Sequence, residues 1–177
     1  MKRRVVLFVA VAVVLGAAVV FSEGIRVIRE LLAGYEEVPA ISTTGSGELT
    51  ARMNGDQSVS WQLTYSAMES DVTQSHIHFG QRGVNGGISV FLCTNLGNAP
   101  AGITVQPCPV NGGTISGTFD ADGVSGGAAA QGIAAGEFDE LLAAMRAGKT
   151  YVNIHTVDHP GGEVRSQIDP GRGQGHH

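Results

Sequence analysis

Apolar and polar residues alternate with a period of two in several short segments of the chain. The clearest is residues 59–65, where Val, Trp, Leu and Tyr alternate with Ser, Gln and Thr. Because successive side chains of a β-strand point to opposite faces, this alternation predicts a strand with one buried and one polar face. Six further strands are expected at residues 48–53, 72–79, 88–93, 114–119, 151–156 and 163–168.

Turn signals separate these segments. Asn54-Gly55-Asp56 predicts a hairpin between the first two strands, and glycine-rich turns follow at residues 80–87, 111–113, 120–127 and 160–162. Seven short alternating strands joined by such turns are typical of antiparallel all-β folds. The sequence therefore predicts one domain, an all-β sandwich or barrel of about seven or more strands.

One segment predicts a helix instead. Within residues 137–147, apolar residues stand at positions i, i+3, i+4 and i+7, namely Phe138, Leu141, Leu142 and Met145. Acidic residues lie in the first turn, and Gly148 is suited to end the helix. We expect one short helix over residues 137–147 that covers an end of the sheet structure.

The first 22 residues have the layout of a secretory signal. Three basic residues precede residues 5–21, which carry no charge and no strongly polar group. Cleavage after Ser22 is expected; the alternative is an uncleaved anchor, because 17 apolar residues reach the lower limit for crossing a bilayer. Either way the body is expected to be exported: periplasmic, secreted, or anchored in the inner membrane through residues 5–21 and facing outward. Residues 23–31 are interpreted as a leader and residues 169–177 as a disordered tail.

The charge of the exported body excludes one class of partner. Three of the 11 basic residues and none of the 16 acidic residues lie in residues 1–22, so the remainder is clearly acidic. Such a body repels phosphate backbones, and binding to nucleic acid through a basic face is excluded.

Export also decides how the two cysteines are interpreted. In an oxidising compartment Cys93 and Cys108 most simply form one disulfide, closing a loop rich in Gly, Asn and Pro. The alternative is a redox-active pair or a thiolate ligand. The Cys-x-x-Cys spacing typical of such chemistry is missing from the sequence.

Three ordered motifs resemble the CHRD domain, the module repeated in chordin and found singly in exported bacterial proteins. They are Leu-Ala-Gly-Tyr-Glu-Glu-Val-Pro at residues 32–39, Ser-His-Ile-His-Phe-Gly at residues 75–80, and residues 151–168 with Tyr-Val-Asn-Ile-His-Thr and Pro-Gly-Gly-Glu-Val-Arg-Ser-Gln-Ile. Ser166 stands where the family favours Gly. The resemblance covers residues 32–168 and implies an immunoglobulin-like or superoxide-dismutase-like β-fold in an extracellular setting. Chordin members bind growth factors, so it also implies an exported binding module with a protein or surface partner that the sequence does not identify.

Histidines carry the candidate chemistry. Side chains two apart on a strand share a face, so His76 and His78 lie together, on the face opposite Ile77. By the same parity His155 also points away from the core. If the two strands are neighbours, these three side chains form a three-nitrogen site suited to copper or zinc, with His159 as a candidate fourth ligand. The pattern also resembles the copper half of Cu,Zn superoxide dismutase, without its bridging histidine and zinc loop.

Two other interpretations of the histidines stay open. They can bond to backbone carbonyls or to Asn153 and hold loops in place, or they can support redox catalysis. The chain lacks a Gly-x-Ser-x-Gly nucleophile elbow and a phosphate-binding loop, and no catalytic residue is assigned. Glu36 and Glu37 are expected to be solvated, and Glu163 and Arg165 to form a surface pair. The leading functional hypothesis is a binding module without catalytic activity; the alternative is a periplasmic copper or zinc protein, with or without redox activity.

Overall fold

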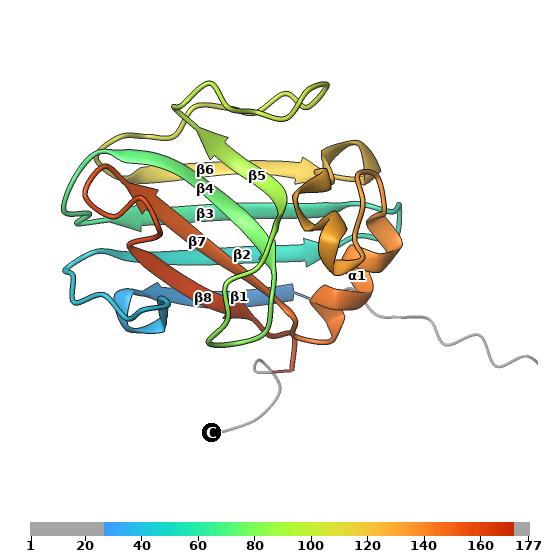
Figure 1. The fold of residues 1–177 in the computed structure, drawn as a ribbon, viewed down its shortest axis with the longest axis horizontal. Coiled ribbons are helices and arrows are strands. Elements are labelled where there is room, and N and C mark those ends of the chain that lie inside the picture. The colour runs from blue at the N-terminus through green and yellow to red at the C-terminus, as the bar shows by residue number, and fades with distance from the viewer. Residues whose placement is uncertain (1–26, 172–177) are drawn as a thin grey trace, which may run out of the picture.

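The computed structural model describes residues 27–171, which form an antiparallel β-structure with one short α-helix (Figure 1). The strands are β1 (Val27–Ala33), β2 (Ser46–Met53), β3 (Val59–Ser66), β4 (Val72–Phe79), β5 (Ile88–Thr94), β6 (Gly113–Phe119), β7 (Thr150–Thr156) and β8 (Val164–Ile168). The predicted all-β class is confirmed.

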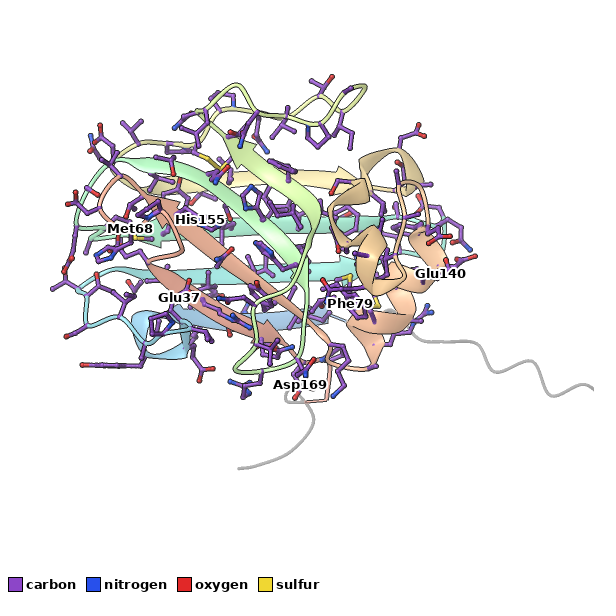
Figure 2. All side chains as sticks on the ribbon, in the orientation of Figure 1. Glu37, Met68, Phe79, Glu140, His155 and Asp169 are labelled. Atoms are coloured by element: carbon purple, nitrogen blue, oxygen red, sulfur yellow. A yellow bond between two sulfur atoms is a disulfide. The ribbon has the colours of Figure 1, made fainter. Side chains whose placement is uncertain are left out.

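All eight strands belong to one sheet in the order β5-β4-β7-β8-β1-β2-β3-β6. The sheet folds back on itself, so that β5, β4, β7 and β8 form one layer that crosses over the layer of β1, β2, β3 and β6 (Figure 1). The layers meet where β8 pairs with β1 through a single register pair, Ala33 with Arg165. Inward side chains of both layers form the core, and Figure 2 draws the side chains on the ribbon of both layers.

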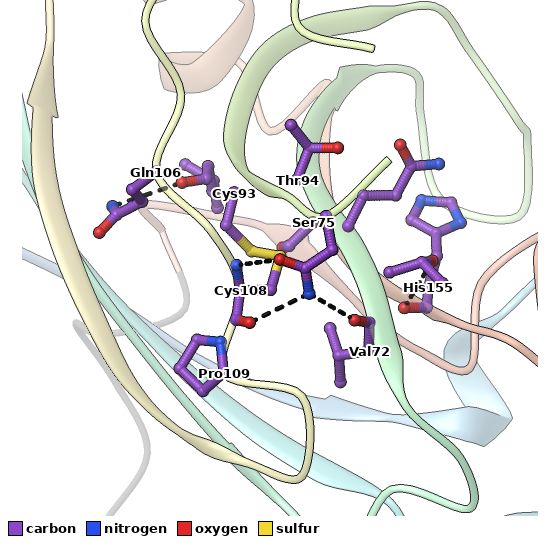
Figure 3. The surroundings of a disulfide bond; sticks show 12 residues. Val72, Ser75, Cys93, Thr94, Gln106, Cys108, Pro109 and His155 are labelled. Atoms are coloured by element: carbon purple, nitrogen blue, oxygen red, sulfur yellow. Dashed lines mark hydrogen bonds between the residues drawn. A yellow bond between two sulfur atoms is a disulfide. The ribbon is translucent and has the colours of Figure 1, made fainter. Parts of the chain in front are cut away.

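The segment between β5 and β6 links the two edges of the sheet and nearly closes it. A disulfide joins Cys93 on β5 to Cys108 in this segment (Figure 3), which confirms the predicted pairing. The Gln106 side-chain amide donates hydrogen bonds to the carbonyl oxygens of Leu92 on β5 and Ser116 on β6, which are the two edge strands of the sheet. The disulfide therefore fastens the connection across the open side of the sheet.

Helix α1 (Phe138–Arg146) covers one end of the two layers, as the sequence predicts (Figure 1). Its buried side chains include Phe138, Leu141, Leu142 and Met145. The ring of Phe138 meets that of Phe119 at the end of β6 edge to face, with centroids 6.1 Å apart. The helix thus seals the apolar interior at this end. Short 3-10 helices at Gly34–Glu36, Ala121–Gly123 and Gly126–Gln131 complete the connections.

The prediction of a leader at residues 23–31 is wrong from Val27 onward, because Val27–Ala33 is strand β1. Ile28, Glu30 and Leu32 point inward and are buried, whereas the residues between them are exposed. Glu30 hides this alternation in the sequence, since a carboxylate occupies an inward position. The structure accommodates it through a hydrogen bond from the Asp169 backbone N–H to Glu30 Oε1.

Residues 1–26 and 172–177 lie outside the described part of the chain. The predicted signal or anchor, the first part of the leader and most of the predicted tail fall there. Within residues 27–171, none of the helices has the length and apolar character needed to cross a membrane.

Candidate functional site: a buried cluster of three histidines

The outer face of the β4–β7–β8 layer is buried, although it carries polar side chains. Every residue of β7 and β8 is buried. The polar and aromatic side chains of this face are His76, His78, Tyr151, Asn153, His155, Arg165 and Gln167. The loop between β4 and β5 covers them: Arg165 donates to the carbonyl oxygen of Val84, and Gln167 donates to that of Gly80. The sheet therefore has a second, polar interior beneath this loop.

His76, His78 and His155 meet in this polar interior because β4 and β7 are neighbours in the sheet. The Nδ1 atom of His76 is 3.2 Å from the Nε2 atom of His155. One ring nitrogen from each of the three residues lies within 4.8 Å of the others. The side chains are 0%, 7% and 6% exposed, in chain order. The structure thus brings together the three histidines that the strand parity placed on one face.

Hydrogen bonds to backbone carbonyls fix the tautomers of two of these imidazoles. His78 Nδ1 is 2.9 Å from the carbonyl oxygen of Gly86, and His155 Nδ1 is 2.9 Å from that of Pro160. A carbonyl oxygen only accepts, so both Nδ1 atoms carry the hydrogen and donate it. The Nε2 atoms of His78 and His155 consequently present lone pairs. The Nε2 atoms of His76 and His78 have no hydrogen-bond partner within the described residues.

Burial keeps all three imidazoles neutral. Desolvation, strengthened by the proximity of His155 and His78, lowers the pKa of His76 to about 2. Desolvation also lowers the pKa of His78 to about 4, against the opposing effect of its bond to Gly86. The pKa of His155 is lowered for the same reason. At neutral pH the cluster is therefore a set of unprotonated nitrogen donors, the form in which histidine binds metal ions.

Aromatic side chains and one guanidinium surround the cluster. The ring of Tyr151 stacks on His78 with centroids 4.6 Å apart and planes 4° apart. The Arg165 guanidinium lies 3.3 Å from the centroid of the same tyrosine ring. The ring of Phe91, on β5, contacts His76 edge to face at 4.4 Å. These contacts hold the imidazole rings in fixed orientations.

Two predictions about charged residues near this site are wrong. Arg165 is buried and bonds to the β4–β5 loop, and Glu163 is also buried, accepting from the hydroxyls of Thr43 and Thr156. Neither forms the expected surface pair. Glu37 is buried rather than solvated, and desolvation raises its pKa to about 7 although Arg165 opposes the shift. Both Glu37 and Arg165 lie in the motifs that carried the family resemblance, which was the only signal in the sequence for their burial.

Glu37 lines a small surface pocket together with residues of the loop between β7 and β8. The pocket measures about 260 Å³ and is bounded by Val38, Asn85, Pro160 and neighbouring residues. The Oε1 atom of Glu37 is buried without a hydrogen-bond partner among the described residues. Figure 2 shows Glu37 and His155 in the region of β7 and β8.

His159, predicted as a candidate fourth ligand, does not belong to this group of three. Its Nε2 atom is 3.0 Å from a carboxylate oxygen of Glu69, and the pair is partly exposed. The loop that contains His159 nevertheless helps to orient the cluster, because the backbone carbonyl of Pro160 accepts a hydrogen bond from His155.

Comparison with known proteins supports the sequence resemblance. The family model described as the CHRD domain matches residues 28–168, which covers most of the chain and every strand from the second residue of β1 to the end of β8. No curated protein and no solved structure shows significant similarity to the chain. On the family match, the chain belongs to the CHRD-domain family.

Proposed function

We propose that the protein is an exported CHRD-domain binding module without catalytic activity. The main support for this proposal is the family match, which spans residues 28–168 and leaves no room for a second domain within that range. Export is supported by the basic start and the uncharged residues 5–21. The disulfide between Cys93 and Cys108 supports it too, because such bonds persist in oxidising compartments.

Fractionation of cells that produce the full chain tests export. We expect the protein in the periplasm or medium, beginning after Ser22 by mass spectrometry, or in the membrane fraction if residues 5–21 are retained. Alkylation of the denatured protein is expected to find no free thiol. Recovery in the cytoplasm with both cysteines reduced contradicts the proposal.

A second candidate function, binding of a copper or zinc ion, is favoured by the histidine geometry. Two imidazole nitrogens bound to one ion at 2.0–2.1 Å stand roughly 3.0–3.5 Å apart when the angle between the bonds is near tetrahedral. The observed separation of 3.2 Å between His76 Nδ1 and His155 Nε2 fits that spacing, and the ligand nitrogens of all three residues lie within 4.8 Å of one another. The carbonyl bonds of His78 and His155 are those that orient metal-binding imidazoles elsewhere.

The structural role that the sequence left open explains only part of this arrangement. Bonds from His78 and His155 to loop carbonyls use the Nδ1 atoms. They leave the Nε2 atoms of His76 and His78 buried and unpartnered, a situation that folded proteins generally avoid. A cation bound between His76 Nδ1 and His155 Nε2 gives the His78 Nε2 lone pair a partner.

Metal analysis of the purified chain tests this candidate. We expect about one ion per chain, in line with one cluster of three ligands. His155→Ala is expected to abolish binding, whereas His159→Ala, which removes a nearby imidazole outside the cluster, is expected to retain it. Absence of binding in the unaltered protein, together with a lower melting temperature of His155→Ala, assigns the cluster a structural role instead.

A further inference from the structure

We infer that the cluster of His76, His78 and His155 is built for monovalent copper, Cu(I), held by three nitrogens, in preference to a divalent ion. This inference rests on the metal-binding candidate above and specifies its ligand. It follows from three properties of the site: its charge, its number of ligands and its burial.

The charge of the site favours an ion of low charge. The free-energy cost of moving an ion out of water rises with the square of its charge, so a divalent ion needs much stronger compensation than a monovalent one. All three ligands are neutral, and the group contains no carboxylate or thiolate. Arg165, which contacts the same layer, adds a positive charge that also disfavours a divalent ion.

The number of ligands points the same way. Closed zinc sites in proteins take four protein ligands, and open ones complete three ligands with a water molecule. Among the histidine, cysteine and acidic side chains of the described residues only three converge here, and His159 is turned toward Glu69. Cu(I) has a filled d shell and is satisfied by two or three nitrogen donors, so it needs no fourth ligand.

Burial separates the site from the water that an open divalent site uses. His76, at 0% exposure, lies at the centre, with the Phe91 ring against it. Tyr151 covers one face of His78, and the β4–β5 loop packs on the same side chain, where the carbonyl of Gly86 accepts from His78 Nδ1. Two buried amide oxygens of this layer, Asn153 Oδ1 and Gln167 Oε1, lack a partner among the described residues, and both are neutral donors. A buried pocket of neutral donors favours a monovalent ion over zinc, because burying the lower charge costs less free energy.

Competition titrations test the preference. The full chain carrying His176→Ala and His177→Ala, so that its last two imidazoles cannot contribute, is titrated anaerobically with Cu(I) against bicinchoninate. Zn(II) and Cu(II) are titrated separately against chromophoric chelators. We expect one Cu(I) per chain, bound at least ~100-fold more tightly than Zn(II). X-ray absorption is expected to find three nitrogen neighbours at about 2.0 Å.

Variants keep the result interpretable. His78→Gln is expected to weaken Cu(I) binding at least ~10-fold while circular dichroism shows an unchanged fold, and His159→Ala to leave binding unaltered. Tighter binding of Zn(II) than of Cu(I), above all if Asn153→Ala reduces it, overturns the inference but leaves metal binding in place. Failure to bind any of the three ions overturns both the inference and the metal-binding candidate.

Discussion

His76 Nδ1 lies 3.2 Å from His155 Nε2, in a part of the molecule where neither side chain is more than 6% exposed. The two residues are 79 positions apart in the chain and meet because β4 and β7 pair in the sheet. Since Pro160 fixes the hydrogen of His155 on Nδ1, the Nε2 lone pair of His155 faces His76. In the metal-free protein His76 donates its Nδ1 hydrogen to that lone pair. With a metal ion bound, both nitrogens share the ion.

The metal-free protein is expected to lose stability on acidification. His76 and His78 have folded-state pKa values of about 2 and about 4, and that of His155 is also lowered. Their stabilising contribution is complete above the unfolded-state pKa of about 6.5 and is lost as the pH falls, by about 1.4 kcal/mol per pH unit for each group. Glu37, whose pKa is raised by desolvation, acts in the opposite direction between its ordinary pKa of 4.5 and about 7. Arg165 stays charged throughout and adds no pH dependence.

Urea denaturation of the metal-free protein at pH 7.5, 6, 5 and 4.5 measures this loss. Three histidines outweigh one carboxyl group, so the free energy of unfolding is expected to fall across the series. His78→Gln removes one titrating group and is expected to flatten the curve. A stability that does not change between pH 7 and pH 5 contradicts the assigned burial of the imidazoles.

His155→Ala and His159→Ala form a matched pair of substitutions for stability. Removing His155 deletes a buried side chain and takes the donor from the carbonyl of Pro160, which is expected to cost about 1–3 kcal/mol. Removing His159 breaks only a partly exposed contact with Glu69, expected to cost within about 1 kcal/mol. Chemical denaturation compares the two, and equal losses count against the difference in burial.

Arg165→Ala is expected to release the β4–β5 loop from the sheet. The guanidinium donates to the carbonyl oxygen of Val84 and to Asn85 Oδ1, and it packs on the ring of Tyr151. Loss of these bonds is expected to destabilise the protein by about 3 kcal/mol, since hydrogen bonds to charged groups contribute about 1.5–3 kcal/mol. Hydrogen exchange is expected to accelerate in residues 80–87.

Arg165→Lys separates the role of the positive charge from that of the guanidinium shape, because a lysine ammonium keeps the charge but lacks the planar fork that reaches both acceptors. We expect it to restore little of the protection in residues 80–87. Wild-type exchange rates in Arg165→Lys favour a role for charge alone.

Gly86→Ala tests the close packing of the loop that holds His78. A Cβ at Gly86 meets the backbone carbonyl of Phe79, which cannot move freely because it belongs to β4. We expect the loop to shift, the bond from His78 to Gly86 to break, and metal affinity to fall. Gly161→Ala is the control, since a Cβ there meets nothing within 4 Å. Equal metal affinity of the two variants contradicts this role for the loop.

Removal of the disulfide tests how the open side of the sheet is held. The double substitution Cys93→Ala and Cys108→Ala is expected to lower the free energy of unfolding by about 3 kcal/mol, the loop-entropy value for about 15 residues. The fold itself is expected to survive, because the eight strands remain paired. Urea denaturation of the unaltered protein with and without reductant measures this contribution. The double variant is expected to have the same free energy of unfolding in both conditions.

The sequence by itself determined the local elements of this protein. The period-two alternation predicted seven strands and the 3.6-residue stripe predicted the helix, because each pattern depends only on nearby residues. Parity along two strands also placed His76, His78 and His155 on outward faces. The alternation of apolar and polar residues did not predict β1, because the inward-facing Glu30 interrupts it.

Only the tertiary structure decided what lies next to those faces. Alternation separates the two sides of a strand but contains no information on which strand pairs with it or which loop packs above it. The pairing of β4 with β7 brings the histidines together. The β4–β5 loop packs on His78, the β7–β8 loop packs on His155, and Phe91 of β5 packs on His76. The β4–β5 loop also buries Arg165. A polar residue predicted to face water is therefore part of a second interior, because a distant segment of the chain covers it.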